Sequence, residues 1–183
     1  MRKLIINKTS ISAFDTFNEE YGEILITLYY FLKKVVINIV DYRESKYAQA
    51  ANFEKNDAFA YYILDRNSIE DIIYAEIIIN EDAINRLALS ENEIFAAISH
   101  EIGHIIFYFR TDSALLSVEQ EEMCCDLYAC RINLSESLTS LLNKLIDSGD
   151  YSEDQTQLMR KRLDAITFYR CTYDTNLIHT LQV

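Results

Sequence analysis

The stretch SENEIFAAISHEIGHI, residues 90–105, predicts a helix with a defined start and one buried face. Ser90 and Glu93 have the spacing of a capping box, in which each side chain bonds the backbone N–H group of the other residue. Apolar residues then recur at steps of three and four, which is the period of a helix. These residues are Ile94, Ala97, Ile98, Ile102 and Ile105. We therefore expect a capped, amphipathic helix across this stretch.

His100, Glu101 and His104 form an H-E-x-x-H motif inside this helix. Residues four apart lie on the same helical face, so the two imidazoles can bind one metal ion. Glu101 lies about 100° further round the helix, where its carboxylate can reach a metal-bound water without ligating the ion. This arrangement is typical of zinc hydrolases. The alternative is an ordinary buried helix whose histidines satisfy local hydrogen bonds.

An acidic run after this helix can supply the third protein ligand that a catalytic zinc site needs. Glu122 and Asp126 are four residues apart and can face the same direction from a second helix. One carboxylate can bind zinc while the other accepts the free N–H of a histidine ligand. Glu119 lies on the same face and is the competing ligand. For Glu119 and Glu121 we favour the other interpretation, a solvated acidic helix start.

The two motifs together, H-E-x-x-H at 100–104 and E-x-x-x-D at 122–126, resemble those of the glutamate-ligand zincins, or gluzincins. Within that family the chain is most similar to the CAAX-prenyl-protease/HtpX-type endopeptidases and to the small soluble minigluzincins. Flanking segments extend the resemblance over residues 56 to 165. They are Asn56–Ala60, Ile77–Asn80, Ile84–Leu89 and Arg160–Leu163.

The resemblance implies an α+β fold, a mainly helical zincin-like domain with a small β-sheet, a metal helix carrying H-E-x-x-H and a second helix carrying E-x-x-x-D. It also implies that His100, His104 and Glu122 bind Zn²⁺ and that Glu101 is the general base. Asp126 would orient a histidine ligand. The expected function is that of a zinc metallopeptidase (a metalloendopeptidase), in which a zinc-bound water activated by Glu101 hydrolyses peptide bonds.

Two other functions stay open, a dedicated regulatory protease of one partner protein and a catalytically silent, zinc-stabilised binding module. Glu101 argues against the silent module, because a structural zinc site does not need a base beside an open coordination position. An oxyanion formed during hydrolysis needs a donor besides the metal. The sequence leaves that role open among His179, Tyr173 and Tyr128.

The composition indicates a single domain that spans residues 1–183. Half of the residues are apolar, and no linker divides a chain that has three glycines and no proline. The net charge of −12 argues against nucleic acid and anionic membrane surfaces as partners. The apolar run Ile24–Val40 contains Lys33 and Lys34 near its centre, so we expect no membrane span. A peptide or protein substrate is the expected partner, and the oligomeric state is unknown.

The N-terminus and the cysteines indicate a reducing, cytoplasmic location. Only Leu4, Ile5 and Ile6 are apolar before the chain turns polar, whereas the core of a signal peptide needs about 7–15 apolar residues. The four cysteines show no C-x-x-C spacing, and we expect them to be small core residues rather than disulfides.

The remaining segments are assigned from their period and composition. Residues 14–47 are predicted to be mainly helical, and residues 1–55 form a helical N-terminal part outside the resemblance. Strands are predicted at 59–64 and 72–80, with a turn at 65–68 between them. Tyr74–Ile79 is the candidate edge strand for an extended peptide, and an interior strand is the alternative.

Two further helices and two glycines complete the expectations. Helices are predicted at 134–146 and 153–169, with Gly149 free to take the left-handed conformation that ends a helix. Gly103 lies inside the metal helix, where glycine weakens the helix by roughly 1 kcal/mol relative to alanine. We therefore expect another segment to approach the helix closely at Gly103.

Overall fold

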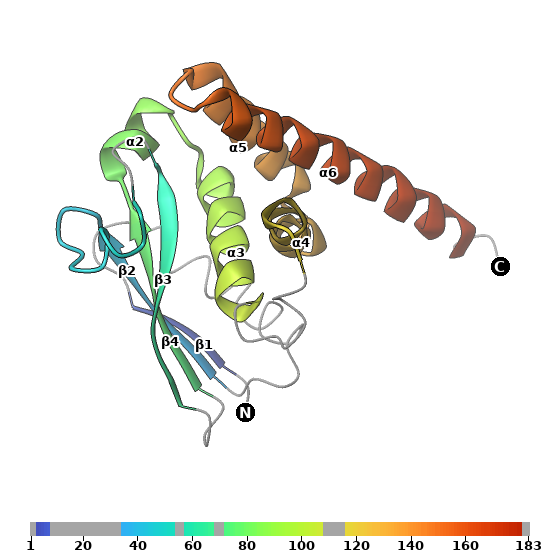
Figure 1. Cartoon of the computed structure of the whole chain (residues 1–183). Coiled ribbons are helices and arrows are strands. Elements are labelled where there is room, and N and C mark those ends of the chain that lie inside the picture. Colours follow the sequence, from blue (N-terminus) through green and yellow to red (C-terminus); the bar gives the residue numbers. More distant parts are fainter. Residues whose placement is uncertain (1–2, 8–33, 54–56, 68–71, 108–115, 181–183) are drawn as a thin grey trace.

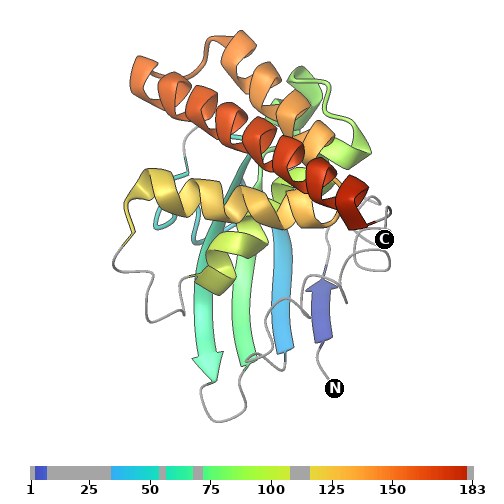
Figure 2. The same cartoon turned by 90° about the vertical axis from the view of Figure 1, so that its right-hand side faces the viewer.

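The protein has an α+β fold in which helices cover one face of a four-stranded sheet (Figure 1). The computed structural model describes residues 3–7, 34–53, 57–67, 72–107 and 116–180. In this part of the chain α3 (Glu91–Phe107) lies against the sheet, and α4 (Val118–Arg131) and α5 (Ser135–Ser148) pack on α3. The long helix α6 (Glu153–Thr180) packs on α4 and α5 (Figure 2). The expected α+β class is confirmed.

The sheet combines parallel and antiparallel pairing in the order β1-β2-β4-β3. Its strands are β1 (Lys3–Asn7), β2 (Lys34–Asp41), β3 (Phe59–Asn67) and β4 (Ile72–Ile79). β1, β2 and β4 are parallel neighbours, whereas β3 and β4 are antiparallel. The two predicted strands are confirmed, but β3 continues through the first residues of the predicted turn.

Strand β2 shows that the prediction of a mainly helical segment over residues 14–47 is wrong at 34–41. Ile37 and Ile39 are fully buried and lie two residues apart, which is the period of a strand. A strand paired on both sides reads as a continuous apolar run, and such a run also fits helical spacing. β1 is likewise a strand within the expected helical N-terminal part. Residues 14–33 lie outside the described residues.

The prediction that Tyr74–Ile79 is an edge strand is also wrong. This segment belongs to β4, which pairs with β2 on one side and with β3 on the other. Ile77 and Ile79 are fully buried against the helices. The interior-strand alternative is therefore confirmed, and β3 forms the edge of the described sheet opposite β1.

The helices after the sheet lie close to their predicted positions. The short helix α2 (Glu81–Arg86) connects β4 to α3 and overlaps the first residues of the flanking segment Ile84–Leu89. α5 and α6 overlap the predicted helices, and α6 extends further, to Thr180. Gly149 has a φ of 69°, so the prediction of a left-handed residue after α5 is confirmed.

The capping box at the start of α3 is confirmed, and it is part of a larger polar cluster. The Ser90 N–H donates to Glu93 Oε2 at 2.6 Å, and the Glu93 N–H donates to Ser90 Oγ at 3.3 Å. Ser140 Oγ and Lys144 Nζ of α5 donate to the same carboxylate at 2.6 and 2.8 Å. Burial alone would raise the pKa of Glu93, but these hydrogen bonds outweigh burial and lower the pKa to about 2. The Glu93 carboxylate therefore fixes α3 to α5.

Helices α3 and α4 approach each other closely at Gly103. A Cβ atom at this position would overlap the ring of Tyr128 and lie 3.0 Å from the Cα atom of Cys125. The expectation of a close approach at Gly103 is confirmed. Because Gly103 lies between the two histidines of the motif, α4 packs against the same turn of α3 that carries them.

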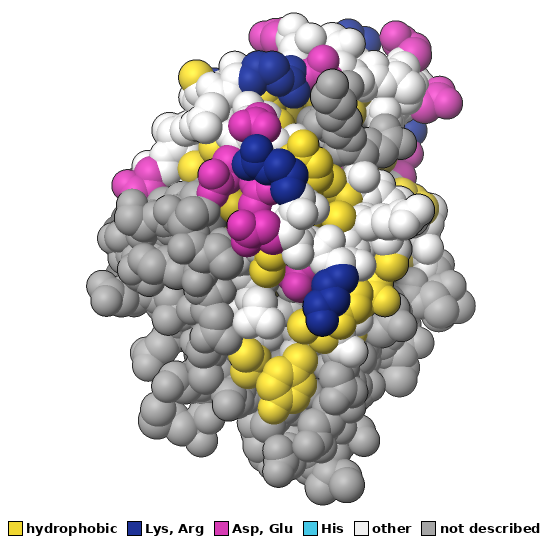
Figure 3. Space-filling view, turned by 90° about the vertical axis from the view of Figure 1, so that its left-hand side faces the viewer, with side chains coloured by type: hydrophobic (Ala, Val, Ile, Leu, Met, Phe, Trp, Pro, Cys, Tyr) yellow, Lys and Arg dark blue, Asp and Glu magenta, His cyan; other side chains and the backbone are white. Residues whose placement is uncertain are grey.

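The surface on the sheet side carries acidic and basic side chains next to one another (Figure 3). Arg43, for example, forms ion pairs with Asp41 at 2.8 Å and with Asp82 at 3.4 Å. Cys124, Cys125 and Cys130 are free thiols. Among the helices of the described residues, none has the length and apolar character needed to cross a bilayer.

Replacing Glu93 with glutamine should destabilise the protein by about 1–3 kcal/mol at pH 7, because hydrogen bonds to a buried charged group are lost. The folded-state pKa of Glu93 lies below its usual value, so its contribution is present above about pH 4.5 and is lost as the pH falls toward 2. The difference in the free energy of unfolding between wild type and Glu93→Gln should therefore shrink between pH 7 and pH 3 in denaturant titrations.

Glu91→Gln is the matched control for this prediction, since Glu91 lies in the same helical turn and is exposed. It should leave the stability within about 0.5 kcal/mol of wild type. A difference between wild type and Glu93→Gln that stays constant from pH 7 to pH 3 would contradict the assigned role of the carboxylate.

Candidate metal centre

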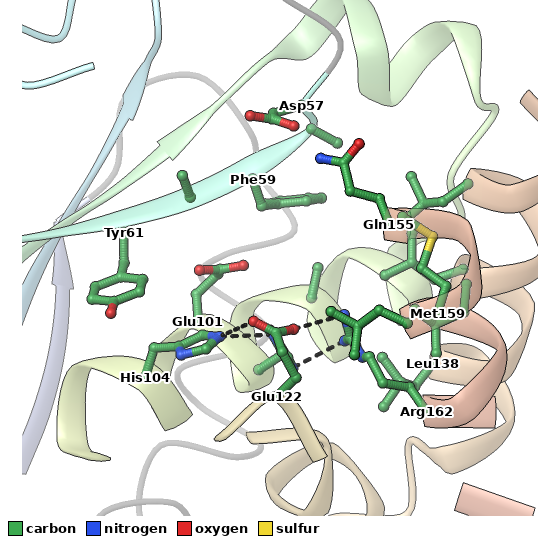
Figure 4. Close-up of a pocket in the computed structure, with 18 of the residues that line it drawn as sticks. Asp57, Phe59, Tyr61, Glu101, His104, Glu122, Leu138, Gln155, Met159 and Arg162 are labelled. Atoms are coloured by element: carbon green, nitrogen blue, oxygen red, sulfur yellow. Dashed lines mark hydrogen bonds and ion pairs between the residues drawn. The ribbon is translucent and has the colours of Figure 1, made fainter. Parts of the chain in front are cut away.

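Three side chains from two helices converge at one end of a cleft. His100 and His104 come from α3, and Glu122 comes from α4. Figure 4 shows His104 and Glu122 next to each other. The Nε2 atoms of the two imidazoles are 3.1 Å apart. The Glu122 carboxylate oxygens lie 3.3 Å from Nε2 of His100 and 3.2 Å from Nε2 of His104. These three donor groups could hold a metal ion.

The spacing of the donor atoms fits a tetrahedral metal site. Metal–donor bonds of about 2.0–2.1 Å place the ligand atoms of a tetrahedron about 3.3–3.4 Å apart. The two Nε2 atoms are 3.1 Å apart, and Glu122 contacts His100 through Oε2 at 3.3 Å and His104 through Oε1 at 3.2 Å, so the three donor groups form a triangle whose shortest contacts are close to this spacing. Two imidazole nitrogens and one carboxylate are also a donor set that zinc accepts, with the fourth position left for water.

A carboxylate holds the outer nitrogen of each imidazole. His100 Nδ1 lies 2.8 Å from Asp126 Oδ1, and His104 Nδ1 lies 2.9 Å from Glu121 Oε1. When each Nδ1–H donates to its carboxylate, each Nε2 presents a lone pair to the centre of the triangle. Asp126 therefore lies where the sequence predicted it, beside a histidine of the motif.

The structure separates the four acidic residues of α4 that the sequence had considered. Glu122 lies beside both histidines, whereas Glu119 pairs with Lys161 on the surface at 2.5 Å. Glu121 lies in the acidic first turn of α4, as expected, and is partly exposed, but its carboxylate also bonds His104, a contact that the interpretation as a solvated helix start did not include. No sequence signal separates Glu121 from Glu119, since both follow the cap residue Ser117 in an acidic run.

Arg162 of α6 contacts two carboxylates of α4 at the site. Its Nη1 lies 2.8 Å from Glu122 Oε2, and its Nε and Nη2 donate to the two oxygens of Asp126 at 2.9 and 2.7 Å. The side chain of Arg162 is only 12% exposed, so these charges interact in a largely dehydrated environment. The sequence placed Arg162 in a flanking segment but assigned it no function.

The charges around the triangle favour a positive species at its centre. Burial would raise the pKa of Glu122, but hydrogen bonds with both histidines and the charge of Arg162 hold it far below its usual range. Burial and Arg162 would lower the pKa of His100, yet the carboxylates of Asp126 and Glu122 raise it to about 9. A metal cation would supply this positive charge in place of the proton.

Glu101 extends into the cleft beside the three donor groups (Figure 4). Burial raises the pKa of the Glu101 carboxyl group. The two histidines lower this pKa and the negative charge of Glu122 raises it, and the net shift is upward. Within the described residues no hydrogen bond or ion pair engages the Glu101 carboxylate. It is therefore available for a proton from a molecule bound in the cleft.

The cleft continues from the donor groups along β3 toward α5 and α6, with a volume of about 470 Å³. Tyr61 of β3 stacks on His104, with ring centroids 5.0 Å apart and planes 8° from parallel. Further along, the wall is largely apolar. The apolar side chains of the wall include Phe59, Ala97, Leu138, Leu142, Leu158 and Met159. Asp57 and Gln155 lie at the end away from the histidines (Figure 4).

The oxyanion donors considered from the sequence are not assembled at this cleft in the described structure. Tyr128 is buried against Gly103 and is absent from the cleft wall. The side chains of Tyr173 and His179 lie outside the described residues. That role therefore stays unassigned.

Comparison of the chain with protein families, with curated proteins and with solved structures found no match. The resemblance to gluzincins therefore stays a prediction from the two motifs and the flanking segments. The convergence of His100, His104 and Glu122 is an independent observation, because it follows from the packing of α3 against α4.

Replacing Glu122 with glutamine should weaken zinc binding by more than about 100-fold. Loss of a residue that only hydrogen-bonds a metal ligand already lowers metal affinity by about 10–100-fold, and Glu122 is itself assigned as a ligand. Glu119→Gln is the matched control, since it makes the same change three residues earlier on α4 and should leave zinc affinity unchanged. Competition titrations with a chromophoric chelator measure both constants. Loss of affinity in Glu119→Gln alone would contradict the assignment of Glu122.

Proposed function

We propose that the protein is a zinc metallopeptidase that hydrolyses peptide bonds in a peptide or protein substrate. The observation that carries the proposal is the position of Glu101, whose carboxylate extends into a cleft beside the two histidines and Glu122. A metal site that only stabilised the fold would be closed by protein ligands and would have no use for this carboxylate. The donor set and its spacing support zinc as the ion.

The residues around the cleft can divide the work of hydrolysis among them. His100, His104 and Glu122 would hold the ion, which supplies Lewis acidity and lowers the pKa of a water. Glu101 accepts the proton that the attacking water loses and later donates it to the leaving amine. Its raised pKa makes the Glu101 carboxylate a stronger base than an exposed glutamate. Arg162 holds Glu122 and Asp126 in place during both steps.

The shape of the cleft supports a peptide as the substrate. β3 is the edge of the described sheet, and its residues Phe59, Ala60 and Tyr61 line the cleft. An edge strand can bind an extended peptide through backbone hydrogen bonds. The apolar wall that α5 and α6 contribute can accept a large apolar side chain next to the scissile bond. We therefore propose peptides with an aliphatic or aromatic residue at that position as substrates.

Glu101→Gln tests the proposal directly. Glutamine keeps the size of the side chain but cannot accept the proton, so hydrolysis should fall by about 10²–10⁴-fold. Zinc content should stay at about one ion per chain, because Glu101 is not assigned as a ligand. Cleavage of a fluorogenic peptide library by zinc-loaded protein, with metal analysis of the same samples, measures both quantities.

Activity that persists in zinc-loaded Glu101→Gln would contradict the assignment of the general base. Zinc binding by the wild type without cleavage of any member of the library would contradict the peptidase proposal, while leaving the metal centre intact. Glu119→Gln serves as the control, since this surface residue should affect neither zinc content nor cleavage.

A further inference from the structure

The two imidazoles of the candidate centre are held by carboxylates in different electrostatic environments. Asp126, which bonds His100, is 2% exposed, and Arg162 neutralises it through two hydrogen bonds. Glu121, which bonds His104 at 2.9 Å, is 31% exposed. Among the described residues no lysine or arginine pairs with Glu121. Within the described part of the chain, the charge of Glu121 is therefore not paired with a basic side chain.

His104 is fixed from two directions. Glu121 of α4 bonds the edge of the ring at Nδ1, and Tyr61 of β3 stacks on its face. The stacked ring restricts tilting, but only a hydrogen-bond acceptor at Nδ1 decides which nitrogen carries the proton. Glu121 is the acceptor that the described structure places there.

We propose that Glu121 is a positioning residue that holds His104 in the orientation and tautomer needed for metal binding, and that the charge of its carboxylate strengthens the bond from His104 to the ion. This inference rests on the proposed zinc site but not on peptide hydrolysis. Glu121 does not reach the ion, because its carboxylate is engaged at the opposite nitrogen of the ring.

The physical basis is the coupling between the two ring nitrogens. A carboxylate that accepts the Nδ1–H proton increases electron density on the imidazole and makes Nε2 a better ligand. A neutral acceptor would preserve the tautomer but supply less of this effect. Without the acceptor, the Nδ1–H of a largely buried ring would have no hydrogen-bond partner. This loss would raise the free energy of the metal-bound protein, in which the proton is on Nδ1, and so weaken metal binding.

Two variants separate the hydrogen bond from the charge. Glu121→Ala removes both and should weaken zinc binding by about 10–100-fold. Glu121→Gln keeps an oxygen that can accept from Nδ1 and should have an affinity between those of Glu121→Ala and wild type. Glu119→Ala is the matched control on the same helix, since it loses a surface ion pair with Lys161 and should bind zinc like wild type.

A spectroscopic measurement distinguishes positioning from a general effect on folding. The chain has only three histidines, so selective ¹⁵N labelling allows the His104 ring to be followed by NMR. In zinc-loaded wild type and Glu121→Gln, the Nδ1–H proton of His104 should be protected from exchange with solvent. In Glu121→Ala this signal should be lost through exchange, while that of His100, held by Asp126, persists.

The outcomes separate this inference from the proposed function. Zinc affinity in Glu121→Ala equal to that of wild type, or a His104 Nδ1–H signal that survives in this variant, would overturn the role of Glu121. A wild-type protein that binds no zinc at all would instead overturn the metal site on which the proposed function depends.

Discussion

The contact between α3 and α4 at Gly103 is the constraint on which the candidate centre depends. Any side chain at this position would meet Tyr128 and the backbone of Cys125, and would separate the two helices. Their close approach brings Glu122 within about one ligand spacing of His100 and His104, which lie three residues before and one residue after Gly103. The cost of glycine inside a helix is thus offset by a contact that assembles three donor groups.

The charges of the site require compensation from outside these two helices. Several carboxylates gather around two imidazoles in a largely buried space, and such a group is stable only with matching positive charge. Arg162 of α6 supplies part of that charge through Glu122 and Asp126. The raised pKa of His100 indicates that the carboxylate charge that Arg162 does not neutralise favours a cation between the donor groups. Helix α6 therefore contributes a side chain to the site and does not only support the helices that form it.

The sequence predicted the parts of this structure that are encoded locally. The helix α3 was predicted from its capping box and apolar period, and the resemblance implied that Asp126 orients a histidine ligand, without saying which one. Gly103 was interpreted correctly because a glycine inside an amphipathic helix needs a reason in packing. The signals for α3 and Gly103 lie within a few residues of the features that they predict, whereas His100 and Asp126 are 26 residues apart and were connected through the family resemblance.

The errors concern features that depend on distant segments. β2 is buried between two other strands, so its apolar residues lack the alternation that would distinguish a strand from a helix. The edge position of β3 follows from the pairing of β4 with β2, which no local pattern encodes. Glu121 reaches His104, 17 residues away in the sequence, only when α4 packs on α3. Arg162 reaches Asp126, 36 residues away, only when α6 packs on α4.

The central claim is that packing of α3 against α4 creates a zinc site from His100, His104 and Glu122. Anomalous diffraction from zinc-loaded crystals, recorded on both sides of the zinc absorption edge, tests it most directly. We expect one strong peak per chain, about 2.0–2.2 Å from Nε2 of each histidine and from a carboxylate oxygen of Glu122. No peak at this position, or a zinc ion bound there through Glu119 or Glu121 in place of Glu122, would show that these three residues do not form the site.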